Sequence, residues 1–367
     1  MLTRARWNCG APMLRARRAV QSMEQYSPPL NERSGLRLDF NENCVGCSPR
    51  VLARLCSIKA DDLARYPERK PVETLVASFL QLLPEQVLLT NGVDEAIHLL
   101  CETYLDEGDE VLLTVPSYSM YRIYAGATGA RIVSVPGFHF PLASLLAKVT
   151  DRTRLIVVAN PNNPTGALAA ESDLLQLAES APQAAVLVDE AYYEFSGRTL
   201  SDKIAAKTNL FVARTFSKAY GMAGLRIGIL GGPVEQMQML RKVCSPYNLN
   251  QVALKCLPEA VEDQEYVHWY VDQVKSSRRQ LEEELRALEI EYWPSHANFV
   301  LARIGDPTRA FVEGMKQQGV LVRDRSSDFG CKGCVRISVG TKEHTARLIE
   351  ALRLVWSEIA VARETAV

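Results

Sequence analysis

A serine, a lysine and an arginine stand in one short connection between two apolar runs. Ser217 and Lys218 follow the run 210–213, and Arg226 precedes the run 227–230. Apolar runs of this length favour buried strands, so we expect the three polar side chains in the loop between two strands. Partial burial lowers the pKa of a lysine, and such a lysine can form a Schiff base with an aldehyde. The stretch therefore predicts carbonyl chemistry at Lys218.

The residues around Lys218 also indicate which aldehyde it would bind. A hydroxyl and a guanidinium are donors that bind a phosphate dianion, and glycines at 221, 224 and 228 allow close approach of the backbone. Pyridoxal phosphate is an aldehyde that carries a phosphate. The alternative is an ordinary lysine and arginine on an exposed turn, which is the commoner setting for any single lysine.

The composition is that of a globular chain that acts on small molecules. With 367 residues and 47% hydrophobic residues, one large domain and a smaller one are expected. The 42 basic and 43 acidic residues nearly balance, which argues against nucleic acid or a membrane surface as partner. No apolar run reaches the roughly 20 residues that span a bilayer. Nine cysteines and no signal peptide predict free thiols and a cytoplasmic location.

The first 25 residues form a basic tail to which we assign no function. This bias resembles that of an organelle transit peptide, and a true start at Met13 or Met23 is an equal alternative. The arginines that come before the first acidic residue, Glu24, are Arg4, Arg6, Arg15, Arg17 and Arg18.

Strand and helix patterns alternate through the middle of the chain. This alternation predicts an α/β fold, a mostly parallel sheet with helices on both faces, followed by a smaller α+β domain. We expect a large domain over 48–265 and a small domain formed by 26–47 with 266–367. The expected strands are 87–89, 110–115, 131–135, 155–159, 185–188, 210–213 and 227–230 in the large domain and 298–302, 320–322 and 335–339 in the small one. The expected helices are 94–104, 117–127, a long charged helix over 257–289, 307–318 and one from 343.

Polar residues follow several of the predicted strands, where ligands of parallel sheets bind. Val93 and Asp94 stand at a helix start, which favours a phosphate. Asn163 follows the fourth strand, although asparagine suits many turns. Asp189 and Tyr192 follow the fifth, where an aspartate is also a common helix N-cap. These residues should therefore meet Lys218 at one edge of the sheet.

The stretch 214–228, RTFSKAYGMAGLRIG, resembles the lysine motif of fold-type-I aminotransferases, and within them the histidinol-phosphate aminotransferase branch. The similarity runs from about Tyr26 to the C-terminal helix. It implies a homodimer with pyridoxal phosphate that exchanges an amino group between L-histidinol phosphate and 2-oxoglutarate, with glutamate as product, in histidine biosynthesis. The segment 41–47 departs from the branch, which usually has prolines there.

The resemblance implies roles for the residues that bind the cofactor. Lys218 would hold pyridoxal phosphate and act as catalytic base. Asp189 would pair with the pyridine nitrogen, and Tyr192 and Asn163 would bind the ring hydroxyl. Tyr118 would stack on the ring, or alternatively be an ordinary core tyrosine. The residues expected around the cofactor phosphate are Val93, Asp94, Ser217, Arg226 and Tyr66 of the neighbouring subunit.

Three further residues would bind the substrate if the resemblance holds. Arg336 would clamp a carboxylate, although a charge on an edge strand is the alternative reading. Arg323 and Tyr26 would hold the phosphate of histidinol phosphate. The alternatives are an aromatic or other aminotransferase, or a phospho-amino-acid decarboxylase of the same fold. A regulator that senses the cofactor is disfavoured, because the segment before Tyr26 is too short for a DNA-binding domain of three helices.

Two Cys-x-Gly-Cys pairs stand at opposite ends of the sequence, Cys44 with Cys47 and Cys331 with Cys334. Four thiols that converge could bind zinc, and oxidation to disulfides is a second possibility. The five histidines show no metal-binding spacing. We expect free thiols and no metal.

Overall fold

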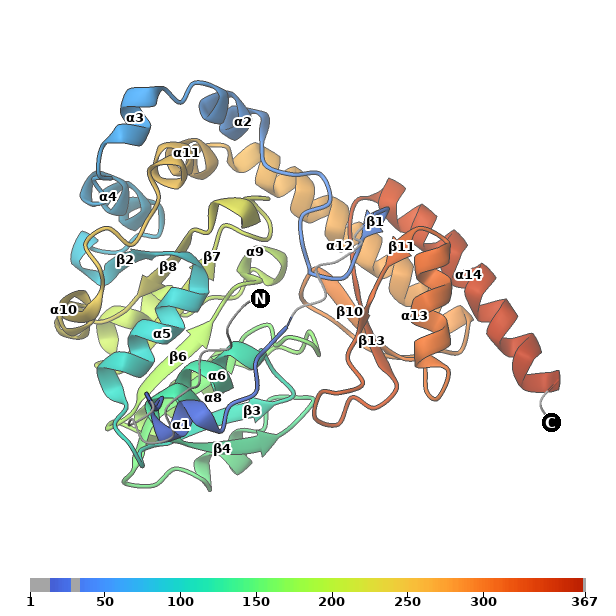
Figure 1. Ribbon diagram of the computed structural model, residues 1–367, viewed down its shortest axis with the longest axis horizontal. Helices are drawn as coiled ribbons and strands as arrows, with labels where there is room; N and C mark the ends of the chain where they lie inside the picture. The colour runs from blue at the N-terminus through green and yellow to red at the C-terminus, as the bar shows by residue number, and fades with distance from the viewer. Residues whose placement is uncertain (1–13, 28–33, 366–367) are drawn as a thin grey trace, which may run out of the picture.

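A seven-stranded sheet forms the centre of the larger lobe in the computed structural model, which describes residues 14–27 and 34–365 (Figure 1). The strand order is β2-β8-β7-β6-β5-β3-β4. Strand β8 runs antiparallel to both of its neighbours, and the other pairings are parallel. The strands are β2 (Val87–Thr90), β3 (Glu110–Val115), β4 (Arg131–Pro136), β5 (Thr153–Ala159), β6 (Ala185–Asp189), β7 (Leu210–Thr215) and β8 (Gly228–Gly231).

Both faces of this sheet are covered, which explains why its strands are apolar without alternation. Leu187 of β6 packs in a cluster with residues of α5 (Gly92–Tyr104) and α6 (Ser119–Thr128). The preceding Val186 packs in a different cluster, with residues of α8 (Glu171–Ser180). Because successive side chains of a strand point to opposite faces, the two clusters lie on the two sides of the sheet. The predicted α/β fold is confirmed.

The smaller lobe is built on an antiparallel sheet with the order β12-β13-β10-β9. Helices α13 (Thr308–Gln317) and α14 (Lys342–Thr365) pack beside it (Figure 1). A separate parallel pair joins β1 (Leu36–Arg37) to β11 (Val320–Leu321), so residues 36–37 belong to this lobe although they precede every strand of the larger one. The four strands of the antiparallel sheet are β9 (Glu291–Trp293), β10 (Phe299–Arg303), β12 (Arg323–Asp324) and β13 (Cys334–Ser338).

The prediction of one long helix over 257–289 was wrong, because two helices occupy this part of the chain. The chain forms α11 (Gln251–Glu262) and α12 (Gln264–Ala287), and the break lies at Asp263. The Asp263 side chain accepts a hydrogen bond from the Tyr266 N–H at 3.4 Å and so caps the second helix. A short polar side chain at the junction thus outweighed the continuous helical pattern.

Other helices were not predicted from sequence, and one predicted helix begins later than expected. Helix α6 begins at Ser119, with Tyr118 as its N-cap, instead of at residue 117. The additional helices are α1 (Arg18–Gln21), α2 (Pro49–Cys56), α3 (Ala60–Ala64), α4 (Lys70–Phe79), α7 (Leu142–Leu146), α8, α9 (Tyr193–Ser196) and α10 (Val234–Val243).

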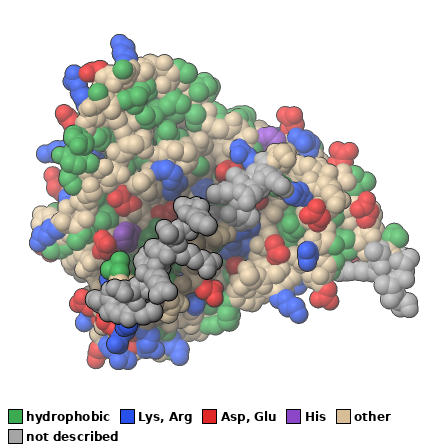
Figure 2. All heavy atoms as spheres, viewed as in Figure 1, with side chains coloured by type: hydrophobic (Ala, Val, Ile, Leu, Met, Phe, Trp, Pro, Cys, Tyr) green, Lys and Arg blue, Asp and Glu red, His purple; other side chains and the backbone are tan. Residues whose placement is uncertain are grey.

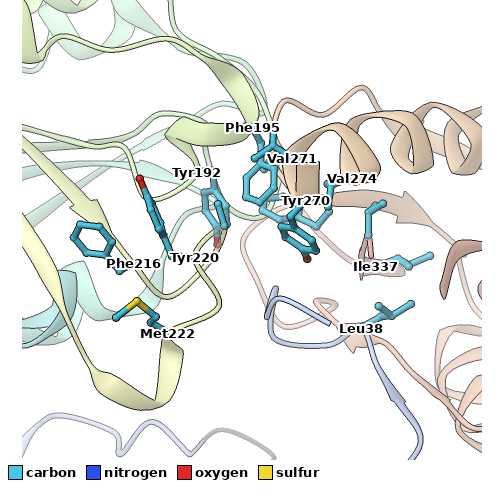
Figure 3. Close-up of a cluster of buried hydrophobic side chains, with 14 of the residues drawn as sticks. Leu38, Tyr192, Phe195, Phe216, Tyr220, Met222, Tyr270, Val271, Val274 and Ile337 are labelled. Carbon is cyan, nitrogen blue, oxygen red and sulfur yellow. The ribbon is translucent and has the colours of Figure 1, made fainter. Parts of the chain in front are cut away.

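One hydrophobic cluster joins the two lobes (Figure 3). Tyr192 and Phe195, which follow β6, pack with Tyr270, Val271 and Val274 of α12. The rings of Phe195 and Tyr270 meet edge to face with their centroids 6.4 Å apart. The loop after β6 is therefore fixed by contacts with both lobes.

The described part of the basic tail, from residue 14, lies against the larger lobe. Helix α1 packs on α6, and the Arg17 guanidinium donates a hydrogen bond to the Ala127 carbonyl. The arginines at positions 4 and 6 lie outside the described residues. No helix within 14–27 or 34–365 has the length and apolar character needed to cross a membrane.

Candidate active site

The predicted polar residues meet at one edge of the seven-stranded sheet. Asn163 and Lys218 follow the carboxyl ends of β5 and β7, and Asp189 is the last residue of β6; the three strands are parallel. Arg226 comes just before β8. Because β8 is antiparallel, its beginning lies at the edge where the other strands end. The reversed direction of β8 therefore brings Arg226 to the same edge as Lys218.

Lys218 has the environment of a nucleophilic amine. Its Nζ donates a hydrogen bond to the Phe40 carbonyl at 3.2 Å. Burial, followed by the charge of Arg336, lowers the pKa of Lys218 to about 8. About a tenth of the amine is therefore neutral at pH 7, far more than for an ordinary lysine, and the lowered pKa agrees with the sequence prediction for this lysine.

Asp189 ends β6 as a buried carboxylate with a partner on each oxygen. Oδ1 accepts a hydrogen bond from the Ala191 N–H at 3.0 Å. Oδ2 accepts one from the Tyr121 hydroxyl at 2.6 Å. Burial raises the pKa of Asp189 to about 6, and the two hydrogen bonds and the charge of Lys218 act in the opposite direction. The Asp189 carboxyl group is therefore mostly ionised when the pH is above about 6.

Tyr192 lies at the centre of a hydrogen-bonded network that crosses between the lobes. Its hydroxyl oxygen accepts hydrogen bonds from Asn41 Nδ2 at 2.9 Å and Asn163 Nδ2 at 3.3 Å. The Asn163 Oδ1 in turn accepts one from Arg336 Nη1 at 2.7 Å. Arg336 Nη2 donates to the Asp39 carbonyl at 2.7 Å, whereas its buried Nε has no hydrogen-bond partner. One donor of Arg336 thus remains unpaired.

The start of α5 carries a second group of predicted residues. Arg226 Nη2 donates to Asp94 Oδ2 at 3.2 Å, and the Tyr118 hydroxyl donates to Asp94 Oδ1 at 2.9 Å. Val93 is nearly buried in the same helical turn, where free backbone N–H groups favour an anion. Ser217 is also buried, and its N–H donates to Thr215 Oγ1 at 3.1 Å.

Two of the three glycines expected near Lys218 are required by close contacts. A Cβ at Gly221 would lie 2.1 Å from the Gly46 carbonyl oxygen, and a Cβ at Gly228 would lie 2.8 Å from the Gly92 carbonyl carbon. A Cβ on Gly224 would meet nothing within 4 Å, so the expected close approach at Gly224 was wrong. The lack of a side chain at Gly221 allows the backbone at Gly46 to pack directly against the loop that carries Lys218.

The two predicted substrate arginines stand opposite each other in the smaller lobe. Arg323 of β12 is the register partner of Arg336 of β13 in an antiparallel pair. Its guanidinium carbon lies 5.3 Å from the ring centre of Phe40, whose carbonyl accepts the Lys218 hydrogen bond. Burial is the main cause that lowers the pKa of Arg336 to about 10, and the charges of Arg325 and Arg323 act in the same direction. Two arginines at directly paired positions can together bind an anion.

Within one chain, Tyr26 lies in a cavity beside the site, whereas Tyr66 lies on the exposed surface. Tyr26 lines a cavity of about 810 Å³ together with Ser117, Tyr118 and Asp328. The face in Figure 2 is hollowed between the lobes, and lysine and arginine side chains lie along that hollow. Tyr66 is 76% exposed and stacks on Tyr247, with ring centroids 4.4 Å apart.

These donors match the chemistry of pyridoxal phosphate. Asp189 offers a buried carboxylate to a protonated pyridine nitrogen, and Lys218 offers an amine to the aldehyde. Arg226 and the N-terminus of α5 offer donors to a phosphate. Gly92 leaves the space for this arrangement, because a Cβ there would lie 2.7 Å from Arg226 Nη2. The residues present therefore fit the cofactor that the sequence predicted.

Two residues of the network were missed by the sequence analysis, Tyr121 and Asn41. Tyr121 stands three residues after Tyr118 at the start of a helix, a spacing that places both side chains on one face. That spacing was a usable signal. Asn41 has a positive φ of 55° and donates to Tyr192, which stands 151 residues later. No local pattern identifies such a contact.

The two cysteine pairs lie in different parts of the fold. Cys44 and Cys47 pack against the cluster that joins the lobes, whereas Cys331 and Cys334 are buried beside Leu301. Burial raises the pKa of Cys44 to about 11, so its thiol is neutral at neutral pH. Within the described residues, no group of three or more potential ligands is placed to hold a metal ion. The four thiols therefore do not converge as a zinc site would require.

Comparison with known proteins matches the chain to one enzyme family. Residues 33–352 match the family model "Aminotransferase class I and II". The chain is 35% identical over 341 residues to histidinol-phosphate aminotransferase 1 of Bacillus cereus, covering 90% of this chain and 91% of that protein. It is 32% identical over 344 residues to histidinol-phosphate aminotransferase 2 of Legionella pneumophila, covering 91% and 93%.

Solved structures share the fold over nearly the whole chain. The crystal structure of histidinol-phosphate aminotransferase from Sinorhizobium meliloti in complex with pyridoxal-5'-phosphate superposes with a TM-score of 0.87. It covers 95% of this chain and 99% of that one at 24% identity, so this likeness concerns the fold.

Proposed function

The chain belongs to the class I and II aminotransferases, in the histidinol-phosphate aminotransferase branch, and from this premise we propose its substrates and the roles of its residues. Its cofactor is pyridoxal phosphate. The reaction is the transfer of the amino group of L-histidinol phosphate to 2-oxoglutarate, which gives imidazole acetol phosphate and L-glutamate, a step of histidine biosynthesis.

In this proposal the residues at the sheet edge hold the cofactor. Asp189 pairs with the pyridine nitrogen, Tyr192 and Asn163 bind the ring hydroxyl, and Tyr118 lies against the ring. The residues that hold the phosphate are Val93, Asp94, Ser217, Arg226 and, from a second subunit, Tyr66. When bound, pyridoxal phosphate supplies an electron sink that stabilises negative charge on the substrate carbon.

Lys218 is the catalytic base of this proposal. Its neutral amine accepts the proton from the amino-bearing carbon of the substrate and returns a proton to the cofactor side. The pKa of about 8 makes the amine a suitable acceptor near neutral pH, because the ideal base has a pKa close to the working pH. The Phe40 carbonyl, 3.2 Å from Nζ, keeps the amine directed into the site.

The observation that carries the substrate assignment is the placement of Arg323 opposite Arg336. Residues directly opposite in an antiparallel pair have their Cβ atoms about 4.5–5.5 Å apart, and like charges there are destabilising. An anionic substrate relieves this repulsion. In the proposal Arg336 clamps the near carboxylate of glutamate, and Arg323, with Tyr26, holds the phosphate of histidinol phosphate.

We expect Arg323→Ala to reduce kcat/KM for histidinol phosphate about tenfold to a hundredfold. The reason is that a hydrogen bond to a charged group contributes about 1.5–3 kcal/mol. Glutamate should lose less, because Arg336 remains. The measurement is a set of single-turnover rates with each amino donor, including phenylalanine, tyrosine and threonine phosphate.

Arg303→Ala is the matched control for this variant. Arg303 lies on β10, which β13 separates from β12, and it pairs with Glu291 at 2.7 Å on the surface. This change should leave both donors unaffected. An equal loss for histidinol phosphate and glutamate in Arg323→Ala, or no loss for either, would contradict the role given to Arg323.

We also propose a homodimer in which Tyr66 reaches the cofactor phosphate of the partner subunit. Large apolar side chains are exposed on the helical face around Tyr66, and Figure 2 shows hydrophobic side chains gathered over α2 to α4. Such a face favours burial against a second copy of the chain. The most exposed of these residues are Leu52, Leu63, Tyr66 and Tyr247.

A charge in this face should weaken assembly and cofactor retention together. We expect Leu63→Asp to shift the protein toward monomer on dilution and to release pyridoxal phosphate at the same protein concentrations. Light scattering with size exclusion measures the first, and the absorbance of the filtrate the second. Leu354→Asp, on the exposed side of α14, is the control and should change neither. A fully active monomer would refute the shared site.

We further propose that residues 48–265 form the cofactor domain and that 26–47 with 266–367 form the small domain. The parallel pairing of β1 with β11 supports this division, because it places residues 36–37 with the C-terminal lobe. A cytoplasmic location is supported by the free thiols at the eight cysteines of the described chain.

A further inference from the structure

The hydroxyl of Tyr121 makes the closest side-chain contact to the carboxylate of Asp189. Tyr121 is 2% exposed, and its hydroxyl lies 2.6 Å from Asp189 Oδ2. Burial and the nearby negative charge of Asp189 raise the pKa of Tyr121 well above its ordinary value. The tyrosine hydroxyl therefore keeps its proton and donates it in the hydrogen bond to Asp189.

The first turn of α6 connects this contact to the opposite end of the site. Tyr118 and Tyr121 meet edge to face, with ring centroids 5.5 Å apart and an interplanar angle of 86°. The Tyr118 hydroxyl binds Asp94, which pairs with Arg226. One helical turn thus donates to two carboxylates, one at each end of the site.

The simpler interpretation is that Tyr121 is a core tyrosine whose buried hydroxyl donates a hydrogen bond to whichever acceptor is near. Tyr104 is such a case, because its hydroxyl donates to Gln236 at 2.9 Å, away from the sheet edge. Tyr121 differs in its acceptor, a buried carboxylate that has no cationic partner at hydrogen-bonding distance among the described residues. Asp189 therefore depends on neutral donors to remain charged, and removal of one of them changes its protonation.

We propose that Tyr121 is a positioning residue for the cofactor, which orients the Asp189 carboxylate and keeps it ionised so that it can pair with the pyridine nitrogen. The inference rests on the cofactor assignment and does not depend on the identity of the amino donor. Its test can therefore be made by cofactor binding alone, without any substrate.

The test compares Tyr121→Phe with the wild type by equilibrium binding of pyridoxal phosphate to the cofactor-free protein from pH 6 to 9. We expect the dissociation constant to rise about tenfold to a hundredfold, the effect of one hydrogen bond to a charged group. The difference should grow as pH falls, because loss of the donor raises the pKa of Asp189 and protonates it earlier. Tyr104→Phe, the control, should bind as the wild type does.

The pH comparison holds the other groups near Asp189 constant. Those that act on it are Tyr118 at the N-cap of α6, Asp94 of α5, Lys218 after β7 and Tyr192 after β6. All of them are present in both proteins, so their titration cancels in the ratio of the two dissociation constants. What remains in that ratio is the effect of the Tyr121 hydroxyl.

A double-mutant cycle separates positioning from a merely structural role. In an Asp189→Asn background there is no carboxylate to keep ionised, so the added Tyr121→Phe change should cost little. Additive losses in the double variant would overturn the proposal, as would a Tyr121→Phe protein whose affinity and pH dependence equal those of the wild type. Turnover of histidinol phosphate, measured separately, tests the proposed substrate independently of this result.

Discussion

Lys218→Ala is expected to abolish turnover, with a loss of at least about 10³-fold, and to remove the visible absorbance of lysine-bound cofactor. The variant lacks both the amine that holds pyridoxal phosphate and the base that moves the substrate proton, and general base catalysis alone contributes about 10²–10⁴-fold. Stopped-flow rates and an absorbance spectrum of the purified protein measure both effects. Retained lysine-type absorbance in this variant would show that another residue holds the cofactor.

The control for Lys218→Ala must show that the fold survives. Burial disfavours the charged form of Lys218, so the native state is less stable with the protonated amine than with a neutral group. Removal of the amine therefore relieves a cost at pH 7, and the melting temperature of the cofactor-free variant should stay within a few degrees of the wild type. Lys207→Ala, which removes a surface pair with Glu179 at 2.5 Å, should retain full activity.

The second largest effect is expected for Asp189→Asn. An amide cannot pair with a protonated pyridine nitrogen, and breaking a buried ion pair costs about 3–5 kcal/mol. We therefore expect cofactor affinity and kcat to fall together by about 10²–10³-fold. The dissociation constant of pyridoxal phosphate and the steady-state rates at saturating cofactor measure the two losses.

Glu194→Gln tests whether any buried carboxyl would have the same effect. Burial also raises the pKa of Glu194, to about 7, and one of its oxygens has no hydrogen-bond partner. It lies on α9, two residues after Tyr192. Activity should be unchanged in this variant. If Asp189→Asn proved as active as Glu194→Gln, the carboxylate would have no part in the reaction.

The sheet was predictable from the sequence because its strands are apolar at nearly every position. The apolar runs 110–115, 155–159 and 185–188 are typical of strands that are buried on both faces of a sheet. Polar residues directly after such strands lie at the edge of the sheet where ligands bind. The same logic does not apply to helix ends. The break between α11 and α12 depends on one side chain, Asp263, within a continuous pattern.

The parts of the site that the sequence did not indicate depend on contacts between distant segments. Asn41 reaches Tyr192 and Ser338 from a segment with no helical or strand pattern. Arg323 and Arg336 were each assigned by resemblance, but their register as direct neighbours follows only from the pairing of β12 with β13. The proposed role of Tyr66 needs a second chain, which a single sequence does not describe.

The segment around Asn41 also constrains the order in which the site can be assembled during synthesis. Its side chain and that of Ser338, which bond to each other, lie 297 residues apart, and β1 pairs with β11 near the other end of the chain. The contacts of this early segment with β11 and β13 therefore cannot form until nearly all later residues have emerged from the ribosome. Closing so large a loop is entropically costly and slow. A nascent chain stalled before β13 would contain Lys218 and Asp189 but would lack Arg336, which bonds to Asn163, and Ser338, which bonds to Asn41. The cofactor is therefore expected to bind only after the complete chain is released.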